Sequence, residues 1–170
     1  MTGPILVADI GGTNVRFGLG TEPQKPVEKI LKYQISTFPN PETAVRKYFD
    51  DLGLSEGEIG GIKKACFAAA GPVEDDVVSL TNGSWLIDKA QIARLFDLDF
   101  LLINDFSGLA NAIPYLPETE LLKLGSGEPV AGSPKAIFGP GTGLGVSGAV
   151  PDRAGGWIVL SGEGGHVAFA

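Results

Sequence analysis

Hydrophobic residues in the first hundred positions fall into short runs that glycine, proline and asparagine separate. Apolar runs of about four to eight residues, and runs that alternate with polar residues, are typical of β-strands. The pattern therefore predicts strands at residues 4–10, 15–20, 27–36, 64–70, 77–80, 84–87 and 100–103. The last run is uniformly apolar, which favours a central position in its sheet.

Three segments carry the signals of helices instead. Residues 41–52 bring their apolar side chains onto one face, with Asn40 in place to cap the first turn and Gly53 just beyond the last. Two further helices are predicted, at residues 89–96 with Asp88 as the cap, and from Asn104–Asp105 to about residue 113, before Pro114. Strands that alternate with helices indicate an α/β domain.

The texture of the chain changes after Pro117. Residues 118–134 are polar and contain glycine and proline, as linkers do. Strand-like runs follow at 136–138, 146–150 and 157–160, without a helical segment to cover their sheet. A sheet with an uncovered apolar face cannot stand alone. We therefore predict a complete α/β domain at residues 1–117, a linker at 118–134, and the opening strands of a second, truncated α/β domain at 135–170.

Composition and charge narrow the classes of function. Of the 170 residues 44% are hydrophobic, which supplies a core, while 20 acidic against 13 basic residues give a net charge of −7. Such a charge argues against binding to nucleic acid or to an anionic membrane. No apolar run approaches the roughly 18 residues of a membrane span. Cys66 is the only cysteine, so no intramolecular disulfide can form, and we expect a cytoplasmic, reducing location.

The first glycine-rich loop follows the first strand, in the segment Asp-Ile-Gly-Gly-Thr-Asn at residues 9–14. Gly11 and Gly12 would let backbone N–H groups approach an anion, and Thr13 and Asn14 add side-chain donors. Asp9 is placed to hold a hydrated Mg²⁺ beside that anion. The same residues would also suit an ordinary tight hairpin with a solvated carboxylate, so this loop alone leaves both interpretations open.

A second loop of the same character, Gly-Pro-Gly-Thr-Gly-Leu-Gly, occupies residues 139–145. It is not a Walker A loop, since no Gly-Lys-Ser or Gly-Lys-Thr follows. The glycine spacing at residues 143–148 matches the dinucleotide pattern, with Glu163 twenty residues after its first glycine. That motif needs a helix that begins at the glycines, whereas residues 146–150 predict a strand that Pro151 ends. We therefore favour two β-hairpins that grip a phosphate chain from opposite sides.

Further polar residues follow the apolar run at 100–103. Asn104 and Asp105 stand at the carboxyl end of that strand, where open α/β sheets bind ligands. An aspartate there can accept a hydroxyl proton as a general base, although both residues are also strong helix caps. The only histidine, His166, lies three residues after Glu163 in a loop otherwise rich in glycine, which favours a pocket wall. One histidine and one cysteine argue against a zinc site.

Six motifs occur along the chain in one order, at residues 9–14, 70–73, 81–85, 103–106, 141–145 and 162–167. In this order they resemble the bacterial glucokinases, which belong to the sugar kinase, actin and heat-shock ATPase superfamily. The resemblance covers essentially the whole chain and implies a ribonuclease-H-like, actin-type ATPase fold with a mixed sheet. Members of the family are longer, so the second domain is expected to be incomplete. The cysteine-rich zinc motif of related repressor-type sugar kinases is absent, which indicates the non-zinc group.

By this resemblance the protein would phosphorylate the 6-hydroxyl of glucose with ATP and Mg²⁺, and it would form a homodimer. Asp105 would be the catalytic base, and the sugar would be bound by Asn104, Asp105, Glu163 and His166. The ATP phosphates would meet both glycine-rich loops, namely Gly11, Gly12, Thr13 and Asn14 in the first and Gly141, Thr142 and Gly143 in the second, with Asp9 near Mg²⁺. The family often carries a bulkier residue where this chain has Gly83.

Two alternatives from other classes of protein stay open. A sugar-binding regulator or sensor of the same fold would keep the pocket without catalysis, although a base at Asp105 argues against it. A dehydrogenase is the second alternative, and it rests on the glycine spacing at residues 143–148 alone.

Overall fold

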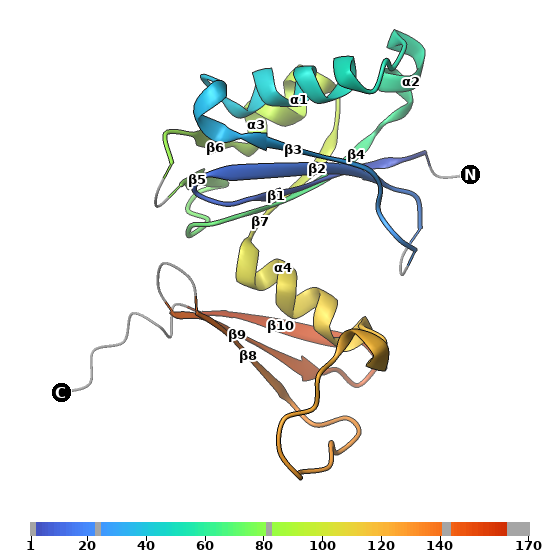
Figure 1. The fold of residues 1–170 in the computed structure, drawn as a ribbon, viewed down its shortest axis with the longest axis vertical. Helices are drawn as coiled ribbons and strands as arrows, with labels where there is room; N and C mark the ends of the chain where they lie inside the picture. Colours follow the sequence, from blue (N-terminus) through green and yellow to red (C-terminus); the bar gives the residue numbers. More distant parts are fainter. Residues whose placement is uncertain (1–2, 23–24, 81–82, 141–143, 163–170) are drawn as a thin grey trace, which may run out of the picture. The chain divides into compact units, whose positions relative to one another are not determined.

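The computed structural model describes residues 3–22, 25–80, 83–140 and 144–162. The chain divides into two compact units, residues 1–105 and 106–170 (Figure 1). The division lies between Asp105 and Phe106, which is earlier than the predicted domain end at residue 117. In the described part of the chain, no helix is long and apolar enough to cross a membrane.

The first unit is built on a five-stranded mixed sheet in the order β3-β2-β1-β4-β7. Its strands are β1 (Ile5–Ile10), β2 (Asn14–Gly20), β3 (Glu28–Gln34), β4 (Lys64–Ala69) and β7 (Asp99–Asn104). The first three form an antiparallel meander, whereas β4 runs parallel to β1 and β7 runs parallel to β4. Each run that predicts a strand in this unit has its counterpart, and the mixed sheet is confirmed.

Helices cover one face of this sheet (Figure 1). They are α1 (Pro41–Asp51), α2 (Glu56–Gly61) and α3 (Lys89–Phe96), with a short 3₁₀ turn, η1 (Ile35–Thr37), before α1. The two predicted caps are confirmed: Asn40 Oδ1 accepts from the backbone N–H of Thr43 at 3.0 Å, and Asp88 Oδ1 accepts from that of Gln91 at 3.0 Å. Helix α2 was not predicted, because three of its six residues are glycines.

The core of the first unit lies between the sheet and these helices. Alternation along the strands sends Leu6, Phe17 and Phe67 to the covered face, where each is at most 1% exposed. The Phe17 ring lies 5.4 Å from the ring of Tyr48 in α1 and 5.8 Å from that of Phe67, and Phe100 packs edge-on against Phe67 at 4.8 Å. This aromatic cluster joins the middle of the sheet to the helical layer.

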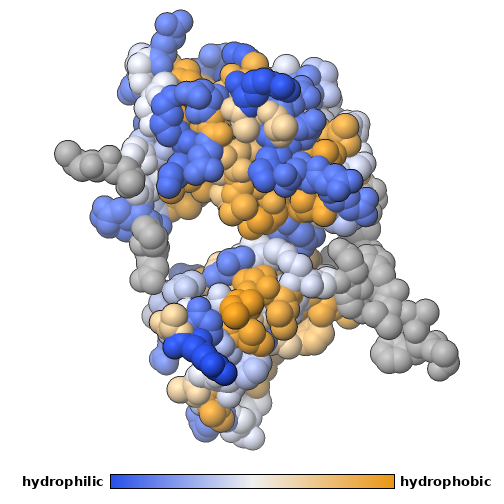
Figure 2. Space-filling model, turned by 180° about the vertical axis from the view of Figure 1, so that it is seen from behind, coloured by the Kyte–Doolittle hydropathy of each residue, from blue (hydrophilic) through white to orange (hydrophobic). Residues whose placement is uncertain are grey.

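One prediction about the sheet is wrong. Strand β7 lies at the edge of the five-stranded sheet, although its uniformly apolar sequence favoured a central position. Phe100 and Leu102 are buried on the covered face, whereas Leu101, on the opposite face, is 53% exposed. Figure 2 shows apolar surface on the side of this unit away from its helices. The run at residues 100–103 of β7 is uniformly apolar because both faces of the strand carry apolar side chains. It is not a sign that β7 has a neighbouring strand on each side.

A two-stranded antiparallel sheet completes the first unit, from β5 (Val77–Ser79) and β6 (Leu86–Asp88). The residue before β6, Trp85, is 1% exposed, and its indole N–H donates to the Phe38 carbonyl at 3.0 Å. This contact ties the β5–β6 segment to the chain between β3 and α1. Residues 81–82, which include half of the predicted Asn-Gly turn, lie outside the described residues.

The second unit holds a three-stranded antiparallel sheet in the order β10-β9-β8. Its strands are β8 (Lys135–Pro140), β9 (Leu144–Pro151) and β10 (Trp157–Gly162). It also contains α4 (Asp105–Ala112) from the second residue of that helix onward, η2 (Ile113–Tyr115) and η3 (Glu118–Glu120). Residues 121–134, within the predicted linker, form neither helix nor strand. The three strands and the helix are confirmed as elements.

The expectation that no helix covers this second sheet is wrong. Helix α4 lies over one face of it (Figure 1). Ser107 and Ala110 are buried there, and the Ser107 hydroxyl is hydrogen-bonded to that of Ser161 in β10 at 2.8 Å. This packing explains why α4 belongs to the second unit rather than to the first.

Candidate functional site

The three parallel strands of the first unit end level with one another. Ile10, the last residue of β1, is the register partner of Ala69 in β4, and Ala69 is the partner of Asn104 in β7. Each of these strands therefore passes into its loop or helix at the same edge of the sheet. Open α/β sheets bind ligands outside the carboxyl ends of their parallel strands. The register thus brings two of the predicted site segments, the first glycine-rich loop and Asn104–Asp105, to one edge.

The first glycine-rich loop is a tight turn between β1 and β2. The backbone N–H of Gly11 donates to the Asn14 carbonyl at 2.9 Å, and the N–H of Ile35 donates to the Thr13 carbonyl at 2.9 Å. One hydrogen bond within the turn and one from Ile35, outside it, therefore hold the turn in shape. The Gly11 amide is used within the turn, so an incoming anion would be met by the amides that follow it.

Nothing in the described structure around Gly11 requires a glycine. A Cβ added there would meet only the Asn14 carbonyl oxygen, at an ordinary distance of 3.6 Å, and the φ angle lies outside the left-handed region. The described neighbours thus leave open space above this residue. Space of this kind lets a ligand approach the backbone closely.

Gly83 lies beside this turn. A Cβ added at Gly83 would stand 3.3 Å from the Gly12 carbonyl oxygen and 2.9 Å from Cδ1 of Leu80. The segment after β5 therefore packs against the glycine-rich turn, and a larger residue at this position would displace Leu80 or the turn. Tight packing gives a local reason for the glycine where the resembling family often carries a bulkier residue.

Arg16 is a member of this region that sequence reasoning missed. It is the register partner of Asp9 across the β1–β2 pair, and its Nη1 donates to Asp9 Oδ2 at 2.8 Å. Both side chains are more than half exposed, at 52% for Arg16 and 58% for Asp9. The sequence contained a signal for this pair. A hairpin that pairs Ile10 with Val15 also pairs the next residues outward, Asp9 and Arg16.

Asn104 and Asp105 occupy the junction between β7 and α4. The Asn104 side chain donates through Nδ2 to the Gly71 carbonyl at 3.1 Å, which joins the end of β7 to the segment after β4. Asp105 is the first residue of α4 and is half-buried. The end of β7 is hydrogen-bonded to a neighbouring segment and passes directly into a helix. The Asp105 carboxylate therefore stands on rigid backbone.

The other predicted site residues belong to the second glycine-rich loop and to the segment that follows β10. Gly141, Thr142, Gly143, Glu163 and His166 lie outside the described residues. The strands that flank the second glycine-rich loop are described, and β8 and β9 form an antiparallel pair in which Pro140 is the partner of Leu144. Because β9 runs as a strand from Leu144, no helix begins at these glycines. The rejection of a dinucleotide-binding motif is therefore confirmed.

The donor set in the first unit suits a loosely held cation and not a dedicated metal centre. Among the described residues, no three His, Cys, Asp or Glu side chains gather as a metal-binding group. Mg²⁺ commonly keeps several waters and is held by one or two carboxylates together with substrate phosphates. A single exposed carboxylate, Asp9, beside a turn open to an anion fits that description.

Comparison with known proteins agrees with this architecture. The family model described as Glucokinase matches residues 6–170. The glucokinase of Cupriavidus metallidurans is 42% identical over 168 residues, which are 98% of this chain and 48% of that protein. The glucokinase of Chromohalobacter salexigens is 41% identical over 171 residues, which are 100% of this chain and 52% of that protein. The chain spans about half the length of the curated relatives it matches.

Solved structures show the same fold. The glucokinase from an Antarctic psychrotroph superposes with a TM-score of 0.82 and 35% identity, covering 100% of this chain and 53% of that one. The glucokinase of Balamuthia mandrillaris, solved in complex with glucose, superposes with a TM-score of 0.67 at 23% identity, covering 99% and 50%. The fold is therefore the actin-like ATPase fold of the sugar kinases. With its family model matched from residue 6 onward, this chain belongs to the glucokinase family.

Proposed function

We propose that the complete gene product transfers the terminal phosphate of ATP to the 6-hydroxyl of glucose. The proposal concerns the complete gene product, since residues 1–170 match only about half of each relative. The observation that carries it is the level register of Ile10, Ala69 and Asn104. That register brings the first glycine-rich turn and the segment Asn104–Asp105 to one edge of the sheet.

Asp105 is the residue we assign as the general base. Its carboxylate accepts the proton of the 6-hydroxyl while that oxygen attacks the terminal phosphorus of ATP, and the oxygen bridging to ADP leaves. A positioned base of this kind contributes roughly 10²- to 10⁴-fold in rate. Asn104, Glu163 and His166 are assigned to the sugar hydroxyls. The Asn104–Gly71 hydrogen bond supports the assignment of Asp105 as the base, because it restrains the end of the strand that Asp105 follows.

The phosphates are assigned to the two glycine-rich loops. In the first loop, the amides and side chains that follow Gly11 face the anion, because the Gly11 N–H already bonds Asn14 within the turn. Gly141, Thr142 and Gly143 are assigned the matching role in the second loop. Asp9 would hold a hydrated Mg²⁺, and the ion would neutralise part of the phosphate charge when bound. Backbone amides and a cation explain how a chain of net charge −7 would accept ATP.

The test replaces Asp105 in the complete gene product. We expect Asp105→Ala to lower turnover by at least 10²-fold in a coupled ADP-release assay. Glucose binding, measured by calorimetry, should stay within a few-fold of wild type because the neighbouring sugar contacts remain. Asp99→Asn is the matched control: it lies on the same strand, at the exposed amino end, and should keep full activity. Near-normal turnover of Asp105→Ala would show that another group is the base.

The same assays separate the proposal from its alternatives. A wild-type protein that binds glucose but releases no ADP would be a sugar sensor and not a kinase. The dehydrogenase alternative is disfavoured by strand β9, and a failure of NAD to raise the melting temperature would remove it.

A further inference from the structure

The ring of Phe106, the residue after Asp105, rests on two glycines of the second unit. A Cβ added at Gly139 would stand 2.5 Å from Cζ and 2.6 Å from Cε1 of that ring. A Cβ added at Gly145 would overlap the ring outright, with Cε2, Cζ and Cδ2 as its nearest atoms. Both positions are thus closed to any side chain for as long as Phe106 keeps this place.

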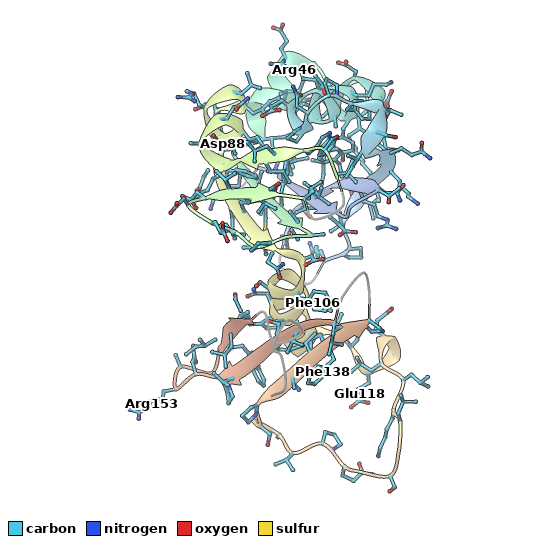
Figure 3. All side chains as sticks on the ribbon, turned by 90° about the vertical axis from the view of Figure 1, so that its left-hand side faces the viewer. Arg46, Asp88, Phe106, Glu118, Phe138 and Arg153 are labelled. Carbon is cyan, nitrogen blue, oxygen red and sulfur yellow. The ribbon has the colours of Figure 1, made fainter. Side chains whose placement is uncertain are left out.

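The two glycines face each other across the β8–β9 pair. Gly139 is the register partner of Gly145, so both present the same face of the sheet at the end where the second glycine-rich loop begins. Directly opposed residues bring their Cβ atoms within about 5 Å of each other. Because neither glycine has a side chain, the backbone between them is flat, and the aromatic ring of Phe106 lies against it. Figure 3 shows Phe106 near the start of α4, beside this hairpin, with Phe138 farther along it.

Backbone conformation does not explain these glycines. Neither Gly139 nor Gly145 has φ in the left-handed region, so other residues could adopt the same backbone. Close approach of a phosphate is one reason for a glycine in such a loop, and it remains the assignment for residues 141–143. At Gly139 and Gly145 the described atom that demands the space belongs to Phe106.

A second contact fixes the same turn of α4. The hydroxyl of Ser107, the next residue, is hydrogen-bonded to that of Ser161 in β10 at 2.8 Å. Two consecutive residues of the first helical turn are therefore held by all three strands of the sheet, Phe106 by β8 and β9 and Ser107 by β10. Because a helix is stiff, holding these residues also fixes the backbone of Asp105, which precedes them.

We propose that Phe106 is a positioning residue, and that the Gly139–Gly145 pair exists to seat its ring and so fix the orientation of Asp105. This inference rests on the proposed function, in which Asp105 is the general base. A catalytic group misplaced by about 1 Å can cost on the order of 100-fold in rate. The seat would therefore act on the chemical step and not on the binding of either substrate.

The first experiment compares two glycine substitutions on the same strand in the complete gene product. Gly145→Ala places a methyl group inside the ring, whereas a methyl group at Gly148 meets only ordinary contacts of 3.5 Å or more. We expect Gly145→Ala to lower kcat about 10- to 100-fold, with the KM for glucose and for ATP within about threefold of wild type. Gly148→Ala should keep kcat within about twofold.

Two results of this comparison would overturn the inference. Equal kcat values for Gly145→Ala and Gly148→Ala would show that the seat does not matter. A raised KM for ATP at unchanged kcat would show that Gly145 serves the phosphates and not Phe106.

A double-mutant cycle tests the contact itself, independently of activity. In a Phe106→Ala background the ring is gone, so Gly145→Ala should add little further loss of stability to urea or of kcat. Additive effects on stability would mean that the ring and the glycine do not interact, which overturns the inference. If the wild-type protein released no ADP with glucose, the proposed function would fail, while coupling in the urea cycle would still establish the seat.

Discussion

Asp9 and Arg16 are cross-strand neighbours in the β1–β2 hairpin, and the guanidinium donates to the carboxylate at 2.8 Å. Because both side chains are more than half exposed, such a pair contributes about 1 kcal/mol or less to folding. We expect the pair instead to orient the carboxylate beside the glycine-rich turn. Substitutions at Asp9 should therefore change ligand binding more than stability.

Asp9→Asn should raise the Mg²⁺ concentration needed for half-maximal rate by about tenfold or more. The substitution keeps the shape of the side chain but removes the charge, and a hydrogen bond to a charged group is worth about 1.5–3 kcal/mol. The measurement is the initial rate of the complete gene product against Mg²⁺ at saturating glucose. The melting temperature should change little. An unchanged Mg²⁺ requirement would remove Asp9 from the cation site.

Asn40→Ala should lower the free energy of unfolding by about 1 kcal/mol, within a range of roughly 0.5–2 kcal/mol. The Asn40 side chain accepts the Thr43 N–H at the start of α1, and alanine leaves that donor without its protein partner. Urea denaturation followed by circular dichroism measures the loss. Asn40→Asp keeps the acceptor oxygen and should behave as wild type. Equal stability of the alanine and aspartate variants would contradict the cap.

Stability should fall as the pH rises from 10 to 12, with Tyr48 as one cause. Its hydroxyl donates to the Lys29 carbonyl at 3.0 Å, and burial raises the pKa of Tyr48 to about 12. Above pH 10 the unfolded chain therefore releases this proton more readily than the folded protein does, which favours unfolding. Burial, followed by a hydrogen bond to Asp51, raises the pKa of Tyr33 in the same direction.

The measurement is the urea midpoint at pH 8, 10 and 12 for wild type, Tyr48→Phe and Tyr115→Phe. Tyr48→Phe should show a smaller fall above pH 10, because its buried ring has no proton to lose. The exposed Tyr115 provides the control, and Tyr115→Phe should follow wild type. Parallel curves for all three proteins would show that Tyr48 does not contribute to the alkaline loss.

Local features of this protein can be predicted from its sequence. Alternation predicts the strands, and Asn40 and Asp88 predict where two helices begin, because caps and periodicity act within a few residues. The strand pattern before Pro151 also suffices to reject a dinucleotide-binding helix, as β9 confirms. The capping box of Ser55 and Glu58 was likewise present in the sequence, but the glycines of α2 concealed it.

Relationships between distant segments depend on the tertiary structure. The edge position of β7, the packing of α4 on the second sheet and the seat of Phe106 on Gly145 each join residues that are far apart along the chain. Alternation says which face a side chain takes but not which strand lies beside it. The sequence alone thus determined the elements and the candidate chemistry at Asp9, Asn104 and Asp105. Strand pairing and close packing decided which of these share an edge, because those contacts are made only when the chain folds.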